Sequence, residues 1–260
     1  MYYSLIFLIH FSLKLNNKIT HQMSFLTIKN SIYLAFFFTL LFSSCLPSTD
    51  TAPYEGGLEM WEEPRHQLVL AKDNFKVMDV VVPAGDTCQF HIHRHPTIYV
   101  LLNGAKYAGQ NWGKEWEQGR IMDLAWAGLV QDMTEPYTTS DPPVYHRMTI
   151  PDDENYHLVA IINTGEGVQN VEKSSRPVNS SWFRENRLEV AANQLSDPIK
   201  FEYPAILVQY TDGLTNILEN GVSHSFKTQK GGYSYHPANT SFQITNQSSA
   251  EQKFVAIEVK

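Results

Sequence analysis

The sequence predicts an all-β protein, and three observations lead to that prediction. Short runs of alternating or continuous apolar residues recur from residue 66 onward, with turn residues between them. Asn-Gly or Asp-Gly pairs, the strongest short signals for a hairpin, follow several of these runs. No window keeps a helical period for more than about two turns. Strands of this length with frequent turns indicate a sandwich or a barrel.

Composition excludes several classes of protein. The chain has 260 residues, of which 43% are hydrophobic and 18% charged, as expected of a globular protein with a buried core. A net charge of −7 argues against nucleic acid as a partner. Two cysteines are too few for a disulfide scaffold or a Cys-rich zinc module. No long apolar span follows residue 45, which excludes a polytopic membrane protein.

The first 45 residues have the pattern of a secretory signal. A lysine precedes an apolar run over 32–42, and two serines stand before Cys45. This pattern resembles the lipobox of bacterial lipoproteins, which implies cleavage before Cys45 and a lipid on its thiol. We therefore expect a signal peptide at 1–44, with Met23 as an alternative start. The protein would be secreted across the inner membrane and lipid-anchored in the bacterial cell envelope, on a periplasmic or outer-membrane face. An uncleaved membrane anchor is the alternative interpretation.

Lipidation of Cys45 would leave Cys88 as the remaining thiol of the chain. An unpaired cysteine in an oxidising compartment is expected to be buried or associated with a metal, because exposed thiols react there. Between the lipid and the first strand, residues 45–63 contain several Pro, Ser and Gly residues and are predicted to form a flexible tether.

The first domain is predicted to span 64–171. Its strands are expected at 67–72, 75–82, 88–93, 97–102, 105–109, 145–150 and 157–162. Asn103 and Gly104 stand between two of these runs and predict a hairpin. The stretch from Thr134 to Pro143 is predicted to be a polar loop beside the mouth of a pocket.

A polar linker at 172–181 separates this domain from a second one at 182–260. Its strands are expected at 183–192, 201–210, 215–219, 223–229, 232–236, 240–246 and 254–259. The pairs at 212–213 and 220–221 predict hairpins again. The elements follow the order of the first domain, which indicates an internal duplication with little residue identity.

Histidines are the residues of this chain best suited to chemistry. His91, His93 and His95 form an HxHxH run inside a predicted strand, where residues two apart point to the same face. Neutral imidazoles arranged in this way can converge on one metal ion. An HxH pair is a weak motif when it stands alone, so its surroundings decide its value.

Those surroundings resemble the first motif of the cupin superfamily. Gly85 is followed by five residues, His91-Ile92-His93, three residues, Thr97, six residues and Gly104. The family has a glutamate where this chain has Thr97. The resemblance implies a jelly-roll β-barrel, or double-sheet, domain with a metal site between its sheets.

The resemblance also implies a third histidine ligand from a later strand. His146 is the preferred candidate because it opens a predicted strand before a proline-containing turn, and His157 is the alternative. The family's usual asparagine four residues later is Ile150 here. The implied site holds one divalent transition metal through His91, His93 and His146. The ion could be Fe, Mn, Ni, Cu or Zn, because sequence does not select among them.

The second half resembles a degenerate cupin domain. Phe242 stands where the second motif has its histidine, and Asn246 stands at the asparagine position. The first-motif histidines would fall near Phe201 and Tyr203. Aromatic side chains of this kind do not replace imidazole ligands, so this half is expected to lack a metal. The fold expected of the whole chain is two tandem cupin domains after a signal peptide.

Six further residues are candidates for supporting roles. Proton transfer or contact with the metal's surroundings is assigned to His95, Tyr99 and Gln89. Stacking on a substrate is assigned to Trp112, Trp116 and Tyr145, although covering the open end of the barrel is the commoner role of such residues.

Two functions follow from these observations. The first is a metal-dependent enzyme that acts on a small organic or sugar-derived substrate by oxygenase or isomerase-type chemistry. The second is a non-catalytic module that binds a small molecule or carbohydrate, which the missing glutamate and the degenerate second half favour. The expected partner is a small molecule, with no nucleic acid and with membrane contact only through the lipid. A homodimer is compatible with either function.

Overall fold

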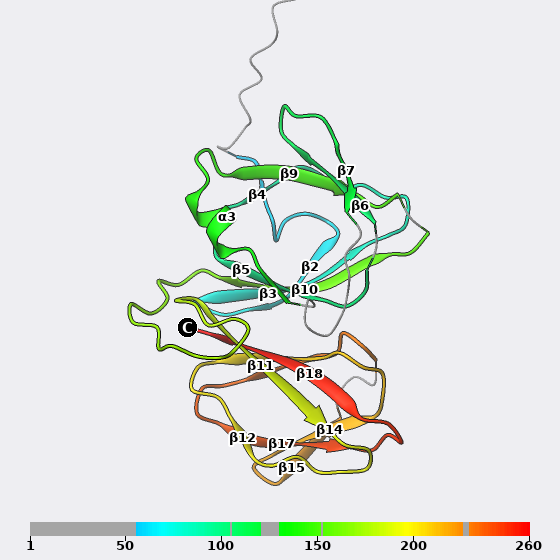
Figure 1. Cartoon of the computed structure of the whole chain (residues 1–260), viewed down its shortest axis with the longest axis vertical. Coiled ribbons are helices and arrows are strands. Elements are labelled where there is room, and N and C mark those ends of the chain that lie inside the picture. The colour runs from blue at the N-terminus through cyan, green and yellow to red at the C-terminus, as the bar shows by residue number, and fades with distance from the viewer. Residues whose placement is uncertain (1–55, 105, 121–129, 152, 226–228) are drawn as a thin grey trace, which may run out of the picture. The chain divides into compact units, whose positions relative to one another are not determined.

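The computed structural model confirms the all-β prediction (Figure 1). It describes residues 56–104, 106–120, 130–151, 153–225 and 229–260, so the expected signal peptide and Cys45 lie outside the described residues. In these ranges the secondary structure consists of β-strands and one short helix, α3 (Thr134–Thr139). None of the described helical residues belongs to an apolar helix long enough to cross a membrane.

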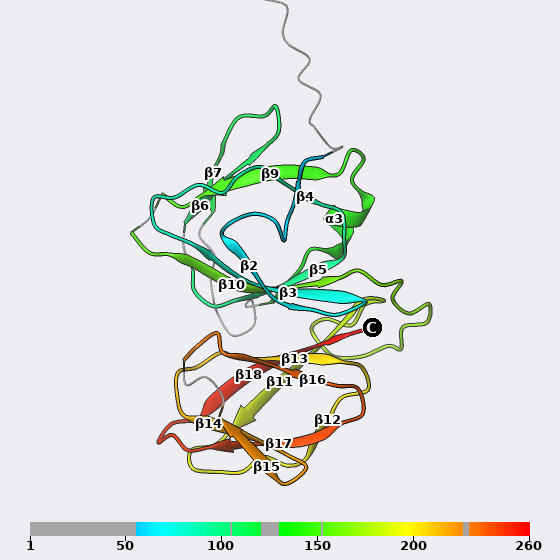
Figure 2. The ribbon, with the colours of Figure 1, turned by 180° about the vertical axis from the view of Figure 1, so that it is seen from behind.

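Two five-stranded sheets face each other in the first half of the chain (Figures 1 and 2). The first sheet has the order β1 (Leu58–Glu59), β4 (His91–His93), β9 (Val144–Thr149), β6 (Tyr107–Asn111) and β7 (Glu117–Arg120). The second has the order β2 (His66–Ala71), β3 (Phe75–Val82), β10 (Tyr156–Asn163), β5 (Thr97–Leu101) and β8 (Val130–Asp132). The buried core of this half contains Met60, Met78, Val80, Val82, Cys88, Leu101, Ile150, Tyr156, Leu158, Ala160 and Ile162.

The second half repeats this arrangement with two four-stranded sheets. One sheet has the order β11 (Phe183–Val190), β18 (Gln252–Val259), β13 (Ala205–Gln209) and β16 (Tyr233–His236). The other has the order β12 (Ile199–Lys200), β17 (Ser241–Asn246), β14 (Thr215–Glu219) and β15 (Val222–Ser225). Their core is formed by Val190, Phe201, Ala205, Leu207, Ile217, Phe242, Ile244, Phe254 and Ala256.

A third hydrophobic cluster joins the two halves. Along β10, Leu158 and Ala160 belong to the core of the first half, whereas Val159 and Ile161 belong to a cluster that also contains residues of β11, β13 and β18. Strand β13 alternates in the same way. Because successive side chains of a strand point to opposite faces, these strands are buried on both sides and read as continuous apolar runs. The two halves therefore keep separate cores and are joined by this third cluster.

The predicted hairpins are only partly correct. Asn220 and Gly221 form the two-residue turn between β14 and β15, and both have the positive φ angles, 51° and 78°, that such a turn requires. The pairs at 103–104 and 212–213 are not hairpins. Each instead carries the chain from one sheet to the facing sheet, from β5 to β6 and from β13 to β14.

Two expectations about loops need correction. The flexible tether predicted at 45–63 ends before residue 58, because Leu58–Glu59 pairs in parallel with His91–Ile92. Met60 and Glu63 are each 1% exposed, so this segment is part of the first half. The loop predicted from Thr134 begins with the short helix α3, which buries Tyr137.

Candidate metal centre

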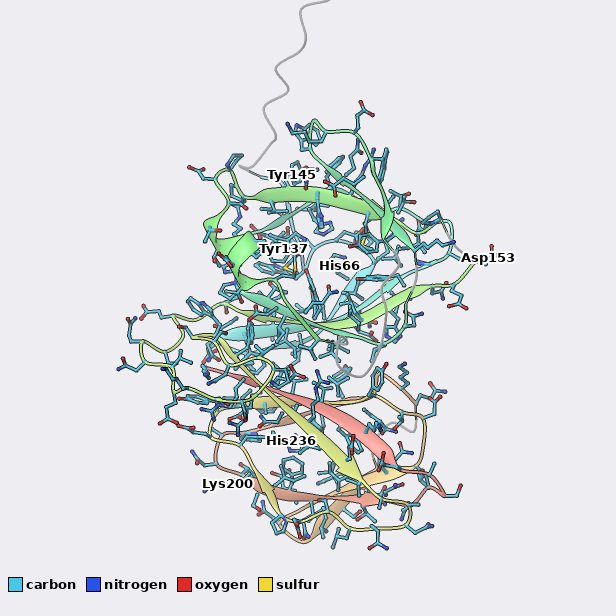
Figure 3. All side chains as sticks on the ribbon, viewed as in Figure 1. His66, Tyr137, Tyr145, Asp153, Lys200 and His236 are labelled. Carbon is cyan, nitrogen blue, oxygen red and sulfur yellow. The ribbon has the colours of Figure 1, made fainter. Side chains whose placement is uncertain are left out.

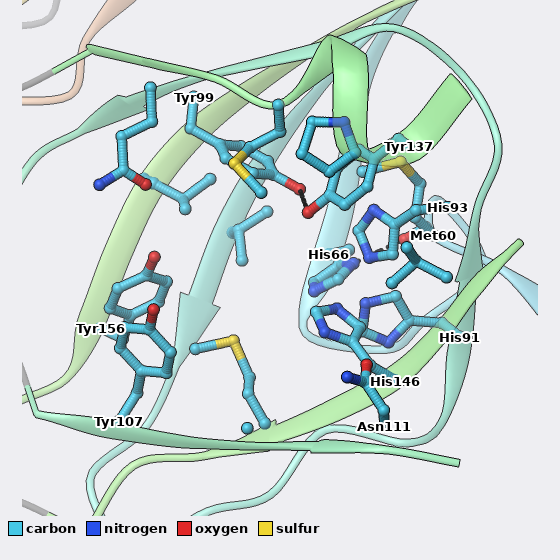
Figure 4. Close-up of a pocket in the computed structure, with 18 of the residues that line it drawn as sticks. Met60, His66, His91, His93, Tyr99, Tyr107, Asn111, Tyr137, His146 and Tyr156 are labelled. Carbon is cyan, nitrogen blue, oxygen red and sulfur yellow. Dashed lines mark hydrogen bonds between the residues drawn. The ribbon is translucent and has the colours of Figure 1, made fainter. Parts of the chain in front are cut away.

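Strands β4 and β9 bring three histidines together. The two strands are antiparallel neighbours in the first sheet, and His91 stands directly opposite His146 in their register. His93 lies two residues along β4 on the same face. One ring nitrogen from each of the three lies within 4.8 Å of the other two. Figure 4 shows the three rings grouped on one wall of a pocket.

The rings are close enough to share one ion. Ring centroids of His91 and His93 are 4.8 Å apart, those of His91 and His146 are 4.9 Å apart, and those of His93 and His146 are 4.6 Å apart. The pairs that include His146 are nearly perpendicular, at 72° and 86°. Such rings present nitrogens to a common point instead of stacking on one another.

His93 gives the clearest sign that a ligand is needed. Its side chain is 2% exposed, and neither Nδ1 nor Nε2 has a hydrogen-bond partner. A buried polar group without a partner costs about 1–3 kcal/mol, so proteins rarely leave one in a core without a reason. A metal ion bound to one of these nitrogens supplies that reason.

His91 is oriented by its own strand. Its Nδ1 lies 2.8 Å from the backbone carbonyl of Gln89, and a carbonyl only accepts, so Nδ1 carries the proton and donates. Nε2 of His91 therefore keeps its lone pair. Metal-binding histidines characteristically donate their second nitrogen in this way, which fixes both the tautomer and the ring orientation.

All three imidazoles are neutral at ordinary pH. Burial, reinforced by the neighbouring His146, holds the pKa values of His91 and His93 well below the usual value near 6.5. Burial, reinforced by His66, lowers the pKa of His146 to about 4. Neutral imidazole is the form that binds metals, so the donor set fits a divalent transition metal.

Thr97, which stands where the resembled motif has a glutamate, does not supply a carboxylate ligand. Thr97 is fully buried, and its hydroxyl donates to the carbonyl of His95 at 2.9 Å. The same hydroxyl lies 3.8 Å from Sδ of Met60. Position 97 is thus tied to neighbouring groups and brings no negative charge to the three histidines.

The three histidines open onto a pocket of about 300 Å³ between the two sheets of the first half. Its wall is mainly apolar and aromatic. It includes four methionines and four tyrosines, which are Met60, Met78, Met133, Met148, Tyr99, Tyr107, Tyr137 and Tyr156. Glu117 is the one carboxylate among the described lining residues, and no lysine or arginine is among them.

Tyr99 lies in this pocket, as expected of a residue that supports chemistry. Its hydroxyl is 3.0 Å from that of Tyr137, which sequence analysis did not single out as a site residue. Burial raises the pKa of Tyr99 well above its usual value and that of Tyr137 to about 12. Tyr137 also packs against His93, with ring centroids 4.2 Å apart. The two neutral phenols thus present hydroxyls beside the histidine group.

The other candidates lie outside the pocket. His95 is half-buried and packs against Trp61 instead. Gln89 has an exposed side chain and contributes only its backbone. His157, the alternative ligand, bonds Asp79 on β3 at 2.8 Å and is not among the residues that line the pocket.

Trp112, Trp116 and Tyr145 are not among the described residues that line the pocket, and their role in substrate stacking stays a prediction. Tyr145 neighbours His146 on β9 and so points to the opposite face of the sheet. There it stacks on Trp112, with ring centroids 5.3 Å apart, and both rings contact Phe90. Figure 3 labels Tyr137 and His66 between the layers and Tyr145 at the outer layer.

A second group of ligand-type residues lies next to the first. Glu63, His66 and Cys88 have side-chain atoms within 4.8 Å of one another, and all three are buried. Burial, reinforced by the charge of Glu63, raises the pKa of Cys88 to about 12, so its thiol is protonated. Arg65 already pairs with the carboxylate of Glu63, at 3.2 Å. This group is therefore less suited to a cation than the three histidines.

In the second half, aromatic residues take the corresponding place. Phe201 and Phe242 are buried with ring centroids 5.6 Å apart, and His236 stacks on Phe242 at 3.8 Å. Within the described residues, neither candidate group of metal ligands belongs to this half.

Comparison with known proteins gives distant likenesses of fold. No family model and no curated protein matches the chain. Similar solved structures include AerE from Microcystis aeruginosa, with 11% identity, a TM-score of 0.49 and coverage of 76% of this chain and 98% of that one. Salicylate 1,2-dioxygenase from Pseudaminobacter salicylatoxidans has 8% identity, a TM-score of 0.48 and coverage of 75% and 76%. A cupin 2 conserved barrel domain protein from Leptotrichia buccalis has 14% identity, a TM-score of 0.47 and coverage of 74% and 87%.

The fold and the three-histidine group define the class of this protein. The described part of the chain is an all-β protein of two double-sheet units joined by a hydrophobic cluster. Its first unit encloses a pocket with a three-histidine group that could hold a metal ion.

Proposed function

We propose that this protein is a bicupin that binds one divalent transition metal through His91, His93 and His146. The observation that carries the proposal is the pair of unpartnered nitrogens on the buried His93, within 4.8 Å reach of the other two histidines. When bound, the ion would supply a Lewis-acid or redox centre next to the pocket. Three protein ligands leave further coordination positions for water and substrate.

The pocket favours a small organic substrate with an uncharged, largely apolar body. Four methionine and four tyrosine side chains line it, and the described lining residues include no cationic side chain to pair with a carboxylate. A sugar acid would therefore find little electrostatic recognition apart from the ion itself. The neutral hydroxyls of Tyr99 and Tyr137 lie 3.0 Å apart and are suited to orient a polar group of the substrate.

The proposed reaction class is oxidation or isomerisation of such a molecule. The role of this chain's own residues is to hold the substrate beside the three histidines and to exclude bulk water from it. Tyr99 and Tyr137 remain protonated at neutral pH because burial raises both pKa values, so their hydroxyls can donate hydrogen bonds to a developing negative charge.

We further propose that the protein acts in the cell envelope, anchored by lipid on Cys45. The support for this location is the leader pattern in the sequence.

A binding function without chemistry is the second candidate. Thr97 favours it, because a three-histidine site without a carboxylate lacks a ligand that the resembled family normally has. The two functions differ in their dependence on metal. A binding module would be stabilised by its ligand without an ion, whereas an enzyme of the proposed kind would need the ion for turnover.

Elemental analysis of residues 46–260, purified without chelator or affinity metal, tests the proposal. We expect about one equivalent of a transition metal per chain. The variants His93→Ala and His146→Ala should lose it, and the matched control His157→Ala should keep it. Wild-type protein that carries no ion and takes none up after incubation with each candidate metal would contradict the proposal.

A further inference from the structure

The segment from Leu58 to His66 runs from one sheet of the first half to the other, with Met60, Glu63 and His66 buried along it. It begins as β1, which pairs in parallel with β4 and so lies beside the HxH strand. Met60 is then buried in the core, and His66 opens β2 in the opposite sheet. The segment thus links the wall that carries the three histidines to the wall that faces them.

His66 lies at the metal centre although it was assigned no role from sequence. It lines the same pocket, and its ring meets that of His91 edge-on, with centroids 4.6 Å apart and an interplanar angle of 81°. This separation matches those within the three-histidine group, which span 4.6 to 4.9 Å. His66 therefore adds an imidazole from the second sheet to those from the first.

A backbone contact prepares His66 for metal binding. Its Nδ1 lies 2.6 Å from the carbonyl of Met60, so Nδ1 donates and Nε2 keeps its lone pair. Burial lowers the pKa of His66, so the ring is neutral. His91 has the same arrangement with the carbonyl of Gln89. Two histidines from facing sheets thus share the tautomer typical of metal ligands.

Met60 connects His66 to the position of the missing acid. Its sulfur lies 3.8 Å from the hydroxyl of Thr97, and its carbonyl holds His66. The same residue therefore packs against the small side chain at position 97 and positions an imidazole nearby.

Glu63 places a buried carboxylate beside Nε2 of this imidazole, on the side away from the Met60 carbonyl. Its side chain is fully buried, and Oε2 lies 3.9 Å from Nε2 of His66. Oε1 accepts a hydrogen bond from the backbone N–H of Gln89 at 3.1 Å, and Gln89 in turn orients His91. Arg65 donates to both carboxylate oxygens of Glu63, from its backbone and its guanidinium. Glu63 is thus held in place as an anion beside two of the histidines.

We propose that His66 is the fourth imidazole of the metal centre and that Glu63 is its positioning residue, together replacing the carboxylate absent at Thr97. This inference rests on the proposed function, because it requires an ion at the three-histidine group. His66 is not one of the three residues whose nitrogens already lie within 4.8 Å of one another. The proposal therefore requires its ring to move toward the ion when the metal binds.

Spectroscopy of the metal-loaded protein tests this inference without any activity assay. Cu(II) would be loaded into the wild type and the variant His66→Asn, whose amide can still donate to Met60 and so preserve the fold. Nitrogen hyperfine splitting in electron paramagnetic resonance counts the imidazoles, and competition with a chelator measures affinity. We expect the variant to show one nitrogen fewer and to bind Cu(II) about 10–100-fold more weakly.

Two further variants complete the design. Glu63→Gln should weaken affinity but keep the wild-type nitrogen count, because Glu63 acts through His66 and Gln89. His157→Ala, a half-buried histidine of the same sheet outside the pocket, should change neither quantity. A His66→Asn variant with the wild-type nitrogen count and affinity would overturn the inference and leave the three-histidine site standing. Failure of the wild type to bind Cu(II) would instead remove the proposed function and the inference with it.

Discussion

His91 and His146 stand directly opposite each other on β4 and β9, with ring centroids 4.9 Å apart and ring planes at 72°. Because both strands belong to one sheet, the backbone hydrogen bonds of the sheet hold this pair in place before any ion binds. The ligand set is thus largely preorganised, and metal binding pays little conformational entropy at these two positions.

Replacing His93 should separate the effect of its buried nitrogens on folding stability from their effect on metal binding. In metal-free protein, His93→Leu removes two unpartnered polar atoms, so the free energy of unfolding should rise or stay level, by up to about 1–3 kcal/mol. With metal, the wild type should gain stability and the variant should not. Thermal denaturation with and without added Zn²⁺ measures both effects. A metal-free variant several kcal/mol less stable than wild type would show that His93 has a structural role instead.

The buried His236 should make stability depend on pH. Burial lowers its pKa from 6.5 to about 4, so the unfolded chain binds a proton in that range and the folded chain does not. Stability is therefore complete above pH 6.5 and is lost as the pH falls toward 4, by on the order of 3 kcal/mol for this residue. Denaturant titrations between pH 4 and 7 should show a shallower slope for His236→Phe than for wild type. Equal pH dependence of the unfolding free energy in wild type and His236→Phe would show that His236 does not cause the loss of stability.

The hydrophobic cluster that joins the two halves should make them unfold as one unit. Ile161 belongs to the cluster that joins them and is fully buried, so Ile161→Ala should cost about 2–5 kcal/mol and lower a single calorimetric transition. Val81 on β3 is 37% exposed and provides a control, with an expected change within about 0.5 kcal/mol. Two separate transitions, only one of which moves in Ile161→Ala, would show that the halves are independent.

The pocket tyrosines should matter for ligand binding, and the outer aromatic cluster should not. Tyr99→Phe removes one hydroxyl beside the histidines and should weaken binding of a neutral phenol about 3–10-fold, the value of one hydrogen bond. Trp116→Ala, on the outer face with Arg147 over its ring, should leave that affinity unchanged. Calorimetric titration with catechol measures both. Equal losses in the two variants would argue that ligand binds on the outer face.

Local spacing was sufficient to predict part of the site. His91 and His93 lie two apart in a strand, and this alternation alone places them on one face. By the same rule Tyr145, which is adjacent to His146 in a strand, points to the opposite face of the sheet. Gln89, two residues before His91, nevertheless has an exposed side chain. The Cys88 amide bonds Met148 while His91 pairs with His146, so one extra residue interrupts the alternation between them.

The rest depends on contacts between distant segments. His66 meets His91 only because β1 and the turn after it carry the chain from one sheet to the other, and no periodic pattern encodes that crossing. Asn103 and Gly104 show that local sequence also leaves part of the fold undetermined. Their residue types specify a turn, but whether the next strand joins the same sheet or the facing one is decided by packing of the core.

An anomalous-scattering map from crystals of the metal-loaded protein, recorded at the absorption edge of the bound metal, tests the three-histidine site most directly. We expect one strong peak per chain in the first half, at a bonding distance of about 2.0–2.2 Å from nitrogens of His91, His93 and His146. No peak at these histidines, or a peak at Glu63 and Cys88 instead, would contradict this expectation.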